Sequence, residues 1–170
     1  MSSVARLRRP LIIALLGFCA LLAAASSFAS GGGQDAGADG DHRGYHLNYL
    51  AVFGGITDED RRERASTVGI EYERLLSERF GIGALVEHAF GDLDFTIYAI
   101  PLAFHSGNWR WYVAPGIEDP DHHPGNEFLL RVGVEYFFQV GNYHVGPQFD
   151  VDFVDGEEVL VLGLTIGRGF

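Results

Sequence analysis

Charged side chains recur at every second position in several apolar segments of this sequence, and they are the residues best suited to chemistry. They are Glu71, Glu73, Glu87, Arg110, Glu118, Arg131, Glu135, Asp150 and Asp152. Because successive side chains of an extended strand point to opposite faces, these charges are expected to share one face. Carboxylates outnumber guanidinium groups there, so they must pair, stay hydrated or become protonated. Arg131 and Asp150, on neighbouring predicted strands, are predicted cross-strand partners.

Two functions fit such a face. The favoured interpretation is a salt-bridged network that fills the space between strands, and the alternative is a gated path for cations. The network residues in both cases are Glu71, Glu87, Arg110, Arg131, Glu135 and Asp150. We expect no catalytic, cofactor-binding or metal-binding role for them.

Three further groups have ligand or nucleophile chemistry, and each has a simpler structural interpretation. His105 and Ser106 offer a base and a hydroxyl, but adjacent residues point to opposite faces and Ser-Gly-Asn is typical of a turn. The segment 150–157 has the acids of a calcium loop without the EF-hand spacing, which favours an acidic strand followed by a turn. The segment 118–123 ends in two histidines and is a candidate for divalent-cation binding, weighed against a solvated loop.

Missing motifs and the net charge argue against several functional classes, among them serine-nucleophile enzymes with a Gly-x-Ser-x-Gly motif, phosphate-loop proteins, proteins with a Cys/His zinc motif and nucleic-acid binders. The sequence has no Gly-x-Ser-x-Gly motif, no phosphate-binding loop and no Cys/His zinc spacing. Of its 12 basic residues, three precede residue 30, so the remainder of the chain has nine arginines against 23 acids, a formal charge of −14. This charge argues against nucleic-acid binding.

The first 44 residues have the features of an export signal and a linker. Three arginines precede an apolar run at 11–25, and Ser27-Phe28-Ala29 is a small-x-small cleavage site, so residues 1–29 are expected to be a cleaved signal peptide. Cys19, the only cysteine, would leave with it. Residues 30–44 are rich in Gly and Asp and are expected to form a flexible linker.

The remaining residues, 45–170, fit one domain made of strands. Eight segments alternate between apolar and polar residues or nearly do: 45–55, 66–76, 79–89, 93–104, 109–118, 127–140, 143–153 and 157–170. None has a helical period, and lengths near ten residues suit tilted strands that cross a bilayer. Short links alternate with longer ones, of which the links 56–65 and 119–126 are expected to face outward.

The composition of the polar face decides which side of a barrel it occupies. Glycine recurs among the charges at Gly69, Gly81, Gly83, Gly116, Gly133 and Gly146. A crowded barrel interior needs such small residues, whereas a solvated surface does not. The opposite face is uninterruptedly apolar in the segment 127–140 and suits lipid. The fourth segment, 93–104, is apolar on both faces, and its direction stays open.

Aromatic residues collect near the expected strand ends, as in interfacial girdles. They are Tyr45, Phe80, Trp109, Phe138, Tyr143 and Phe170 at the predicted periplasmic rim and Phe53, Phe128 and Phe153 at the outer rim. Pro101, Pro115 and Pro147 fall inside strands and predict bulges or shortened pairing, because each deletes a ladder donor.

The last strand, Leu160 to Phe170, carries large residues on one face, glycines on the other and a terminal aromatic. It resembles the terminal strand of bacterial outer-membrane β-barrels, where that end is read by the barrel-assembly machinery, although Arg168 departs from the usual apolar residue. With the Gly69 to Glu73 type of strand, the stretch 45–170 resembles the small eight-stranded barrels that include OmpA transmembrane domains, OmpX and OmpW. That resemblance implies a range of roles, from tethers, adhesins and conduits to a few lipid A-modifying enzymes.

The sequence therefore predicts an all-β fold, an eight-stranded antiparallel up-and-down transmembrane β-barrel in the bacterial outer membrane. The expected role is structural or in surface interaction, with a plugged interior, no enzyme activity and no cofactor. The expected partners are outer-membrane lipid and, through Phe170, the barrel-assembly machinery. The alternatives are a lipid A-modifying enzyme, a narrow cation or small-molecule conduit, and a soluble periplasmic lipocalin-like carrier with an apolar cavity. The oligomeric state and any surface ligand are left open.

Overall fold

The computed structural model describes residues 47–59, 63–91, 93–121 and 125–170. The predicted signal peptide (1–29) and linker (30–44) lie outside the described residues. Among those described, no helix is long and apolar enough to span a membrane. The strands are β1 (Asn48–Glu59), β2 (Glu63–Leu75), β3 (Phe80–Gly91), β4 (Phe95–Ala99), β5 (Leu102–Ser106), β6 (Trp109–Pro120), β7 (Glu127–Tyr136), β8 (Phe138–Val140), β9 (Tyr143–Val154) and β10 (Glu157–Gly169).

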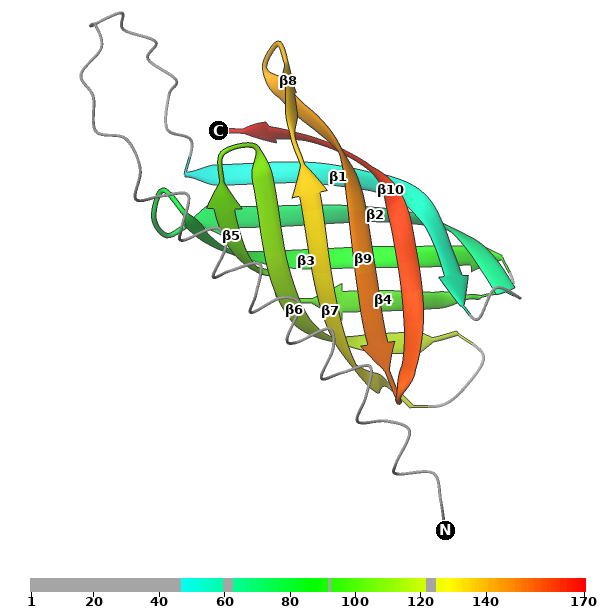
Figure 1. Ribbon diagram of the computed structural model, residues 1–170. Helices are drawn as coiled ribbons and strands as arrows, with labels where there is room; N and C mark the ends of the chain where they lie inside the picture. The colour runs from blue at the N-terminus through cyan, green and yellow to red at the C-terminus, as the bar shows by residue number, and fades with distance from the viewer. Residues whose placement is uncertain (1–46, 60–62, 92, 122–124) are drawn as a thin grey trace, which may run out of the picture. The chain divides into compact units, whose positions relative to one another are not determined.

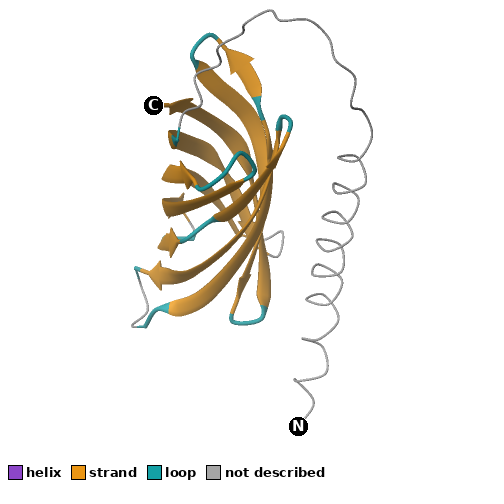
Figure 2. Cartoon of the chain, turned by 90° about the vertical axis from the view of Figure 1, so that its left-hand side faces the viewer, coloured by secondary structure: helices purple, strands orange, loops and turns teal. Residues whose placement is uncertain are grey.

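The strands form a closed antiparallel barrel (Figure 1). It has eight barrel strands, because β4 with β5 and β7 with β8 each count as one. Strand β5 continues the line of β4, and β8 continues that of β7. Strand β10 pairs with both β9 and β1, so the sheet has no free edge among its long strands. Figure 2 shows the strands curving around a common interior. The predicted fold class, an eight-stranded antiparallel β-barrel, is confirmed.

Strand continuity corrects three predicted links. The link predicted at 56–65 is mostly strand, because β1 and β2 stay paired up to Glu59 and Glu63. Strand β6 extends to Pro120, so the link predicted at 119–126 begins at Asp121. Strand β5 includes His105 and Ser106, which were predicted in a turn; the turn itself contains Gly107, whose φ of 60° suits glycine. In each case the strand ladder extends over polar residues that local composition had assigned to a loop.

Prolines shorten pairing without shifting its register. Pro101 separates β4 from β5, yet Ala99 pairs with Gly116 and Leu102 with Val113, which keeps the same register across the gap. The ladder between β9 and its neighbour is likewise interrupted around Pro147, between the pairs Glu135↔Gln148 and Phe138↔Val145. Of the two predicted effects, the prolines therefore produce interrupted pairing, and the strand count of the barrel is unaffected.

The two faces of the barrel wall have opposite character. Arg110 and Arg131, the two arginines of the predicted polar face, are buried and face inward, as do most of the acids of that face. The outer wall, in contrast, is exposed and apolar. Exposed outer residues include Val52, Ile70, Val86, Tyr98, Ile117, Phe149, Leu162 and Leu164. This arrangement is the reverse of a soluble carrier with an apolar cavity and a charged surface, so that alternative is wrong.

The structure shows which face of the fourth predicted segment, 93–104, points into the barrel. Leu93, Phe95, Ile97 and Ala99 are buried and face inward, whereas Tyr98 is 46% exposed on the outer wall. Both faces are apolar because the inner one belongs to a cluster of buried apolar residues, described below, rather than to the charged network.

Aromatic residues surround one end of the barrel, where β1 begins and β10 ends; we call this end the terminal rim. Five of the six residues predicted there, Phe80, Trp109, Phe138, Tyr143 and Phe170, are exposed, and Tyr45 lies outside the described residues. Trp109 stacks with Trp111 at 5.6 Å between ring centroids. At the other end, the opposite rim, Phe128 is 68% exposed as expected, but Phe53 is only 6% exposed. Phe53 faces inward and packs over Gly55 and Gly163, so its assignment to the outer girdle is wrong.

Candidate functional site in the barrel interior

One cluster of buried charges surrounds Arg110, on β6. Its Nε donates to Oε2 of Glu73 at 2.7 Å, its Nη2 contacts Glu71, and its Nη1 lies 3.5 Å from Glu135. His105 extends the cluster from β5, with its Nε2 2.6 Å from Oε1 of Glu73. The guanidinium of Arg110 also lies 4.5 Å from the ring centre of Tyr112. These contacts join strands β2, β5, β6 and β7 across the interior.

A second cluster surrounds Arg131, on β7. Its Nε and Nη2 donate to the two carboxylate oxygens of Asp152, at 2.6 and 2.8 Å. Its Nη1 lies 2.7 Å from Oε2 of Glu87 on β3 and 3.7 Å from Oδ2 of Asp150. The predicted partner Asp150 is therefore in reach, but the residue opposite Arg131 in the strand register is Asp152. The two-pronged Arg131–Asp152 pair is the stronger interaction, because both of its bonds are aligned.

Tyr112 joins the Arg110 and Arg131 clusters. Its hydroxyl donates to Oδ1 of Asp150 at 2.5 Å and accepts from Nε2 of Gln148 at 3.0 Å. Gln148 also donates to Asp150 at 2.8 Å, and its amide oxygen accepts from Thr165 at 2.6 Å. The six predicted network residues thus lie in two ion-pair clusters, all at most 8% exposed. Tyr112 connects the clusters through the contact of its ring with Arg110 and the hydrogen bond of its hydroxyl to Asp150.

Carboxylates exceed arginines in this interior. The buried acids are Glu71, Glu73, Glu87, Glu135, Asp150 and Asp152, against Arg110 and Arg131. The close contact between Glu87 and Arg131 lacks hydrogen-bond alignment, although it satisfies the distance of an ion pair. Oε1 of Glu87 and Oε1 of Glu135 have no hydrogen-bond partner among the described residues. The network is therefore incompletely compensated around these two acids.

Inward glycines leave room for the large charged side chains. A Cβ at Gly133 would collide with the Asp150 carboxylate and the Tyr112 ring. A Cβ at Gly69 would approach Cγ of Glu87 to 2.5 Å, and one at Gly81 would collide with the Glu73 carboxylate. The recurrence of glycine among charges in the sequence therefore has a steric cause.

An apolar layer lies between the charges and the opposite rim. Inward residues near that end of the strands are Ala65, Ala89, Leu93, Phe95, Ile97, Leu129 and Val154, and they form part of one buried cluster. Val159 and Val161 of β10 are buried at the same end. The interior is thus filled by two kinds of packing: the charged clusters lie toward the terminal rim and the middle of the barrel, and mostly apolar side chains, together with the buried Thr57–Thr67 pair, lie toward the opposite rim.

Sequence reasoning missed His105 and Thr165 as members of the network. His105 was assigned to a turn, but counting alternate residues onward from the buried Ala103 would have placed it inside. Thr165 lies on the glycine-rich face of the last strand. Its contact with Gln148 depends on the pairing of β9 with β10, which no local pattern specifies.

Two of the other sequence candidates are separated by the fold, and in the third, the segment 118–123, His122 and His123 lie outside the described residues. Ser106 is exposed beside His105, whose imidazole contacts Glu73, so the structure brings no nucleophile and base together there. Asp150 and Asp152 point inward, away from the exposed turn residue Asp155, as expected for an acidic strand followed by a turn. Phe170 is exposed, and its backbone N–H donates to the carbonyl of Asn48 at 2.9 Å.

The fold and its interior define a small eight-stranded transmembrane-type β-barrel, with an apolar wall outside and charges inside. Two solved structures share this architecture with TM-scores of 0.51. One is a de novo designed transmembrane β-barrel, 12% identical, which matches over 70% of this chain and 94% of its own. The other is the N-terminal β-barrel domain of OprF from Pseudomonas aeruginosa, 14% identical, over 74% and 98%. No family model matches the chain. No curated protein matches it either.

Proposed function

We propose that this protein resides in the bacterial outer membrane and has a structural or surface-interaction role, with a barrel that is plugged rather than open. The observation that carries the proposal is the inverted barrel, in which ion-paired charges are buried and large apolar side chains are exposed around the wall. An exposed apolar belt of this extent would be unstable in water and is suited to lipid. Aromatic side chains at the terminal rim fit the membrane interface.

Two layers of packing support the plug. Eight strands enclose a space just wide enough for side chains to fill. Here the Arg110 and Arg131 clusters occupy one part of that space, and buried apolar residues, Phe95 and Ile97 among them, occupy the part toward the opposite rim. A solute crossing the barrel would have to disrupt both.

Export by a cleaved signal, insertion in lipid through the barrel-assembly machinery and the absence of an enzymatic step belong to the same proposal. The proposed structural or surface-interaction role depends on the barrel wall and the rims, and it requires no cofactor. Toward the opposite rim, the connections between strands are where a surface partner would make contact.

A narrow cation path is the second candidate, and one observation favours it. Six buried acids share the interior with two arginines, and Glu87 and Glu135 each retain an oxygen without a hydrogen-bond partner among the described residues. An excess of negative groups attracts cations into a pore. The packing toward the opposite rim opposes this function, because its buried side chains are mostly apolar and an ion crossing there would lose much of its hydration, with only the Thr57 and Thr67 hydroxyls as polar groups among the buried side chains described at that level.

Planar-bilayer recordings on the purified protein separate the two candidates. The plug predicts no stable open conductance in the wild type. Leu129→Ser and Ile97→Ser introduce polar groups in the apolar layer and would partly open a path. They are therefore the comparison for the wild-type recording. Steady cation-selective currents from the wild type, abolished by Glu135→Gln, would overturn the plug and favour the cation path.

A further inference from the structure

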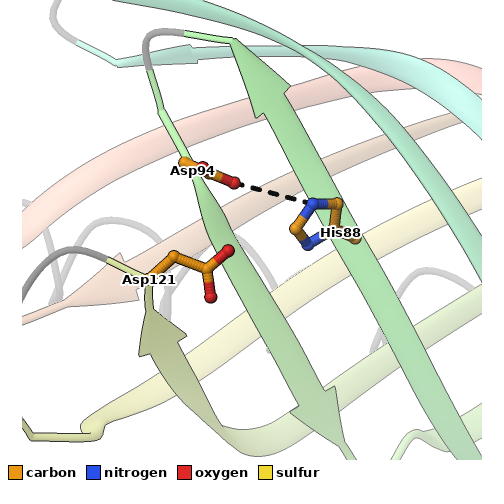
Figure 3. A group of neighbouring side chains, drawn as sticks. All are labelled: His88, Asp94 and Asp121. Atoms are coloured by element: carbon orange, nitrogen blue, oxygen red, sulfur yellow. Dashed lines mark ion pairs between the residues drawn. The ribbon is translucent and has the colours of Figure 1, made fainter.

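Three ligand-bearing side chains meet near the opposite rim, on the outside of the barrel wall, away from the interior network. They are His88 near the end of β3, Asp94 just before β4 and Asp121 just after β6. Each offers one ligand atom, and these atoms all lie within 4.8 Å of one another. Figure 3 shows both carboxylates on the side of the His88 imidazole, from neighbouring segments.

The strand pairing fixes the positions of these residues. Phe95 is opposite Pro120 in the ladder, so Asp94 and Asp121 are the next pair along it. The backbone N–H of Asp121 donates to the carbonyl of Asp94 at 3.0 Å. His88 is paired with Thr96, two residues beyond Asp94. His88 is therefore held within a strand, and Asp94 and Asp121, each one residue outside a strand, are joined by a backbone hydrogen bond that extends the ladder.

The His88 imidazole is oriented by a second contact. Its Nδ1 lies 2.9 Å from the Thr96 hydroxyl oxygen, and the ring packs edge-on against Phe90 with centroids 4.2 Å apart. When Nδ1 donates to that hydroxyl, Nε2 carries the lone pair and faces Asp94. Histidines that bind metals are typically fixed in this way by a hydrogen bond at the other ring nitrogen.

The distance between ligand atoms suits a shared ion. Nε2 of His88 and Oδ1 of Asp94 are 3.6 Å apart, which is longer than a hydrogen bond. Two ligands bound at about 2.0–2.2 Å to one tetrahedral ion lie roughly 3.3–3.6 Å apart. The Asp121 carboxylate lies beside this pair, so that one imidazole nitrogen and two carboxylate oxygens are within reach of one position.

We propose that His88, Asp94 and Asp121 form a binding site for a divalent transition metal ion, with zinc as the expected metal. One imidazole nitrogen and two carboxylate oxygens suit zinc, whereas calcium and magnesium prefer sites made only of oxygen. Three protein ligands leave a fourth position for water or for a group from outside the protein. This site is independent of the proposed plug, because it lies on the other face of the wall.

The direct test is isothermal titration of Zn²⁺ into the full chain, refolded in detergent without an affinity tag. We expect one site of defined stoichiometry that weakens at least tenfold in His88→Ala and in Asp121→Asn. Thr96→Val, which removes only the orienting contact, is expected to weaken binding by about 10- to 100-fold. Glu158→Gln changes an exposed acid at the same rim and is expected to leave the affinity unchanged. Heat-modifiable gel mobility of each variant checks that the barrel is intact.

Three outcomes would overturn the proposal. The first is equal zinc affinity in the wild type and His88→Ala. The second is a site that survives His88→Ala but is lost in a His122→Ala and His123→Ala double variant, since those residues lie in the adjacent link of the sequence. The third is cleavage of a lipid ester that persists in chelator and is lost in Thr96→Ala, because His88, Thr96 and Asp94 would then act as a catalytic group without a metal.

Discussion

Arg131 is completely buried, and it compensates charges from three other residues. Its guanidinium forms a two-pronged pair with Asp152 and lies within ion-pair distance of Glu87 and Asp150. Removing one partner of a buried charge pair leaves the other without compensation, which costs more than the pair itself contributes. At the scale of single residues, stability therefore depends on a few arginines and on the glycines that make room for them.

Arg131→Ala is expected to lower the free energy of unfolding by about 3–5 kcal/mol, because Asp152 and Glu87 lose their partner in the interior. Urea titration of the detergent-refolded protein measures the change. Arg168→Ala, an exposed arginine on the outer wall of β10, is the matched control and should cost about 0–1 kcal/mol. Similar costs for the two variants would show that the Arg131 cluster contributes little to stability.

Gly133→Ala is expected to destabilise the barrel by about 1–3 kcal/mol, since its Cβ would overlap the Asp150 carboxylate and the Tyr112 ring. Gly54→Ala provides the comparison, because a Cβ at Gly54 meets nothing within 4 Å. Both variants replace a strand glycine, so a difference between their denaturation midpoints isolates the steric effect. If Gly54→Ala were the more damaging change, the crowding argument would be wrong.

At the scale of the strand, each element presents one face to the interior and one to the outside. In β7, Leu129, Arg131 and Gly133 are buried, while Val132 is half-buried on the outer wall. In β10, Val161 is buried, whereas Leu162 and Leu164 of the same strand are exposed. One strand thus contributes to the charged network and to the apolar wall at the same time.

Val132→Arg and Leu164→Arg are expected to cost roughly 2–4 kcal/mol each if these positions lie near the bilayer midplane. Glu158→Arg, at the rim of β10, should cost about 0–1 kcal/mol, because charge is tolerated near the interface. Denaturant titration in lipid vesicles gives the three values. Wild-type stability in both mid-strand variants would mean that this face does not meet lipid.

Phe170→Asp is expected to leave the protein exported but not inserted, because the terminal aromatic is the proposed assembly signal. The substitution keeps the backbone bonds between residue 170 and Asn48, so the closing strand pair is retained. Membrane fractionation of cells measures insertion, and refolding of the purified variant in detergent is the control, which should succeed. Normal insertion of Phe170→Asp in cells would remove Phe170 from the assembly signal.

At the scale of the whole molecule, closure is what makes the interior possible. Strand β10 pairs with β1 over the register Tyr49↔Gly169 to Glu59↔Val159, and this seam brings β2 and β10 side chains into one enclosed space. A closed barrel also has no unpaired edge strand from which unfolding could start, so unfolding must break a complete ladder of hydrogen bonds.

Heat-modifiable gel mobility tests that closure together with location. The protein recovered from the membrane fraction is expected to migrate differently before and after boiling, because a closed barrel resists detergent until it is heated. Leu162→Pro, which removes a ladder donor from β10, should abolish the shift. A boiled and an unboiled wild type of equal mobility, or recovery only from the soluble fraction, would contradict the transmembrane barrel.

The sequence by itself determined the number of barrel strands and the inward face of most of them, whereas the inward face of the segment 93–104 came only from the structure. Alternation has a period of two residues and is encoded locally, so the eight segments and the apolar outer face could be predicted without knowledge of any contact. The same local pattern identified the six network residues as members of one face. Its errors are local too: Phe53 was placed by its proximity to a strand end, although the count of alternate residues puts it inside.

Only the tertiary structure decided which of these residues meet. The partner of Arg131 in the register is Asp152 rather than Asp150, and its contact with Glu87 crosses the interior between strands that are not neighbours. The meeting of His88, Asp94 and Asp121 depends in the same way on three segments being aligned at one rim. Such contacts follow from register and closure, which are set by the sum of pairings around the whole barrel and are not specified by any single segment.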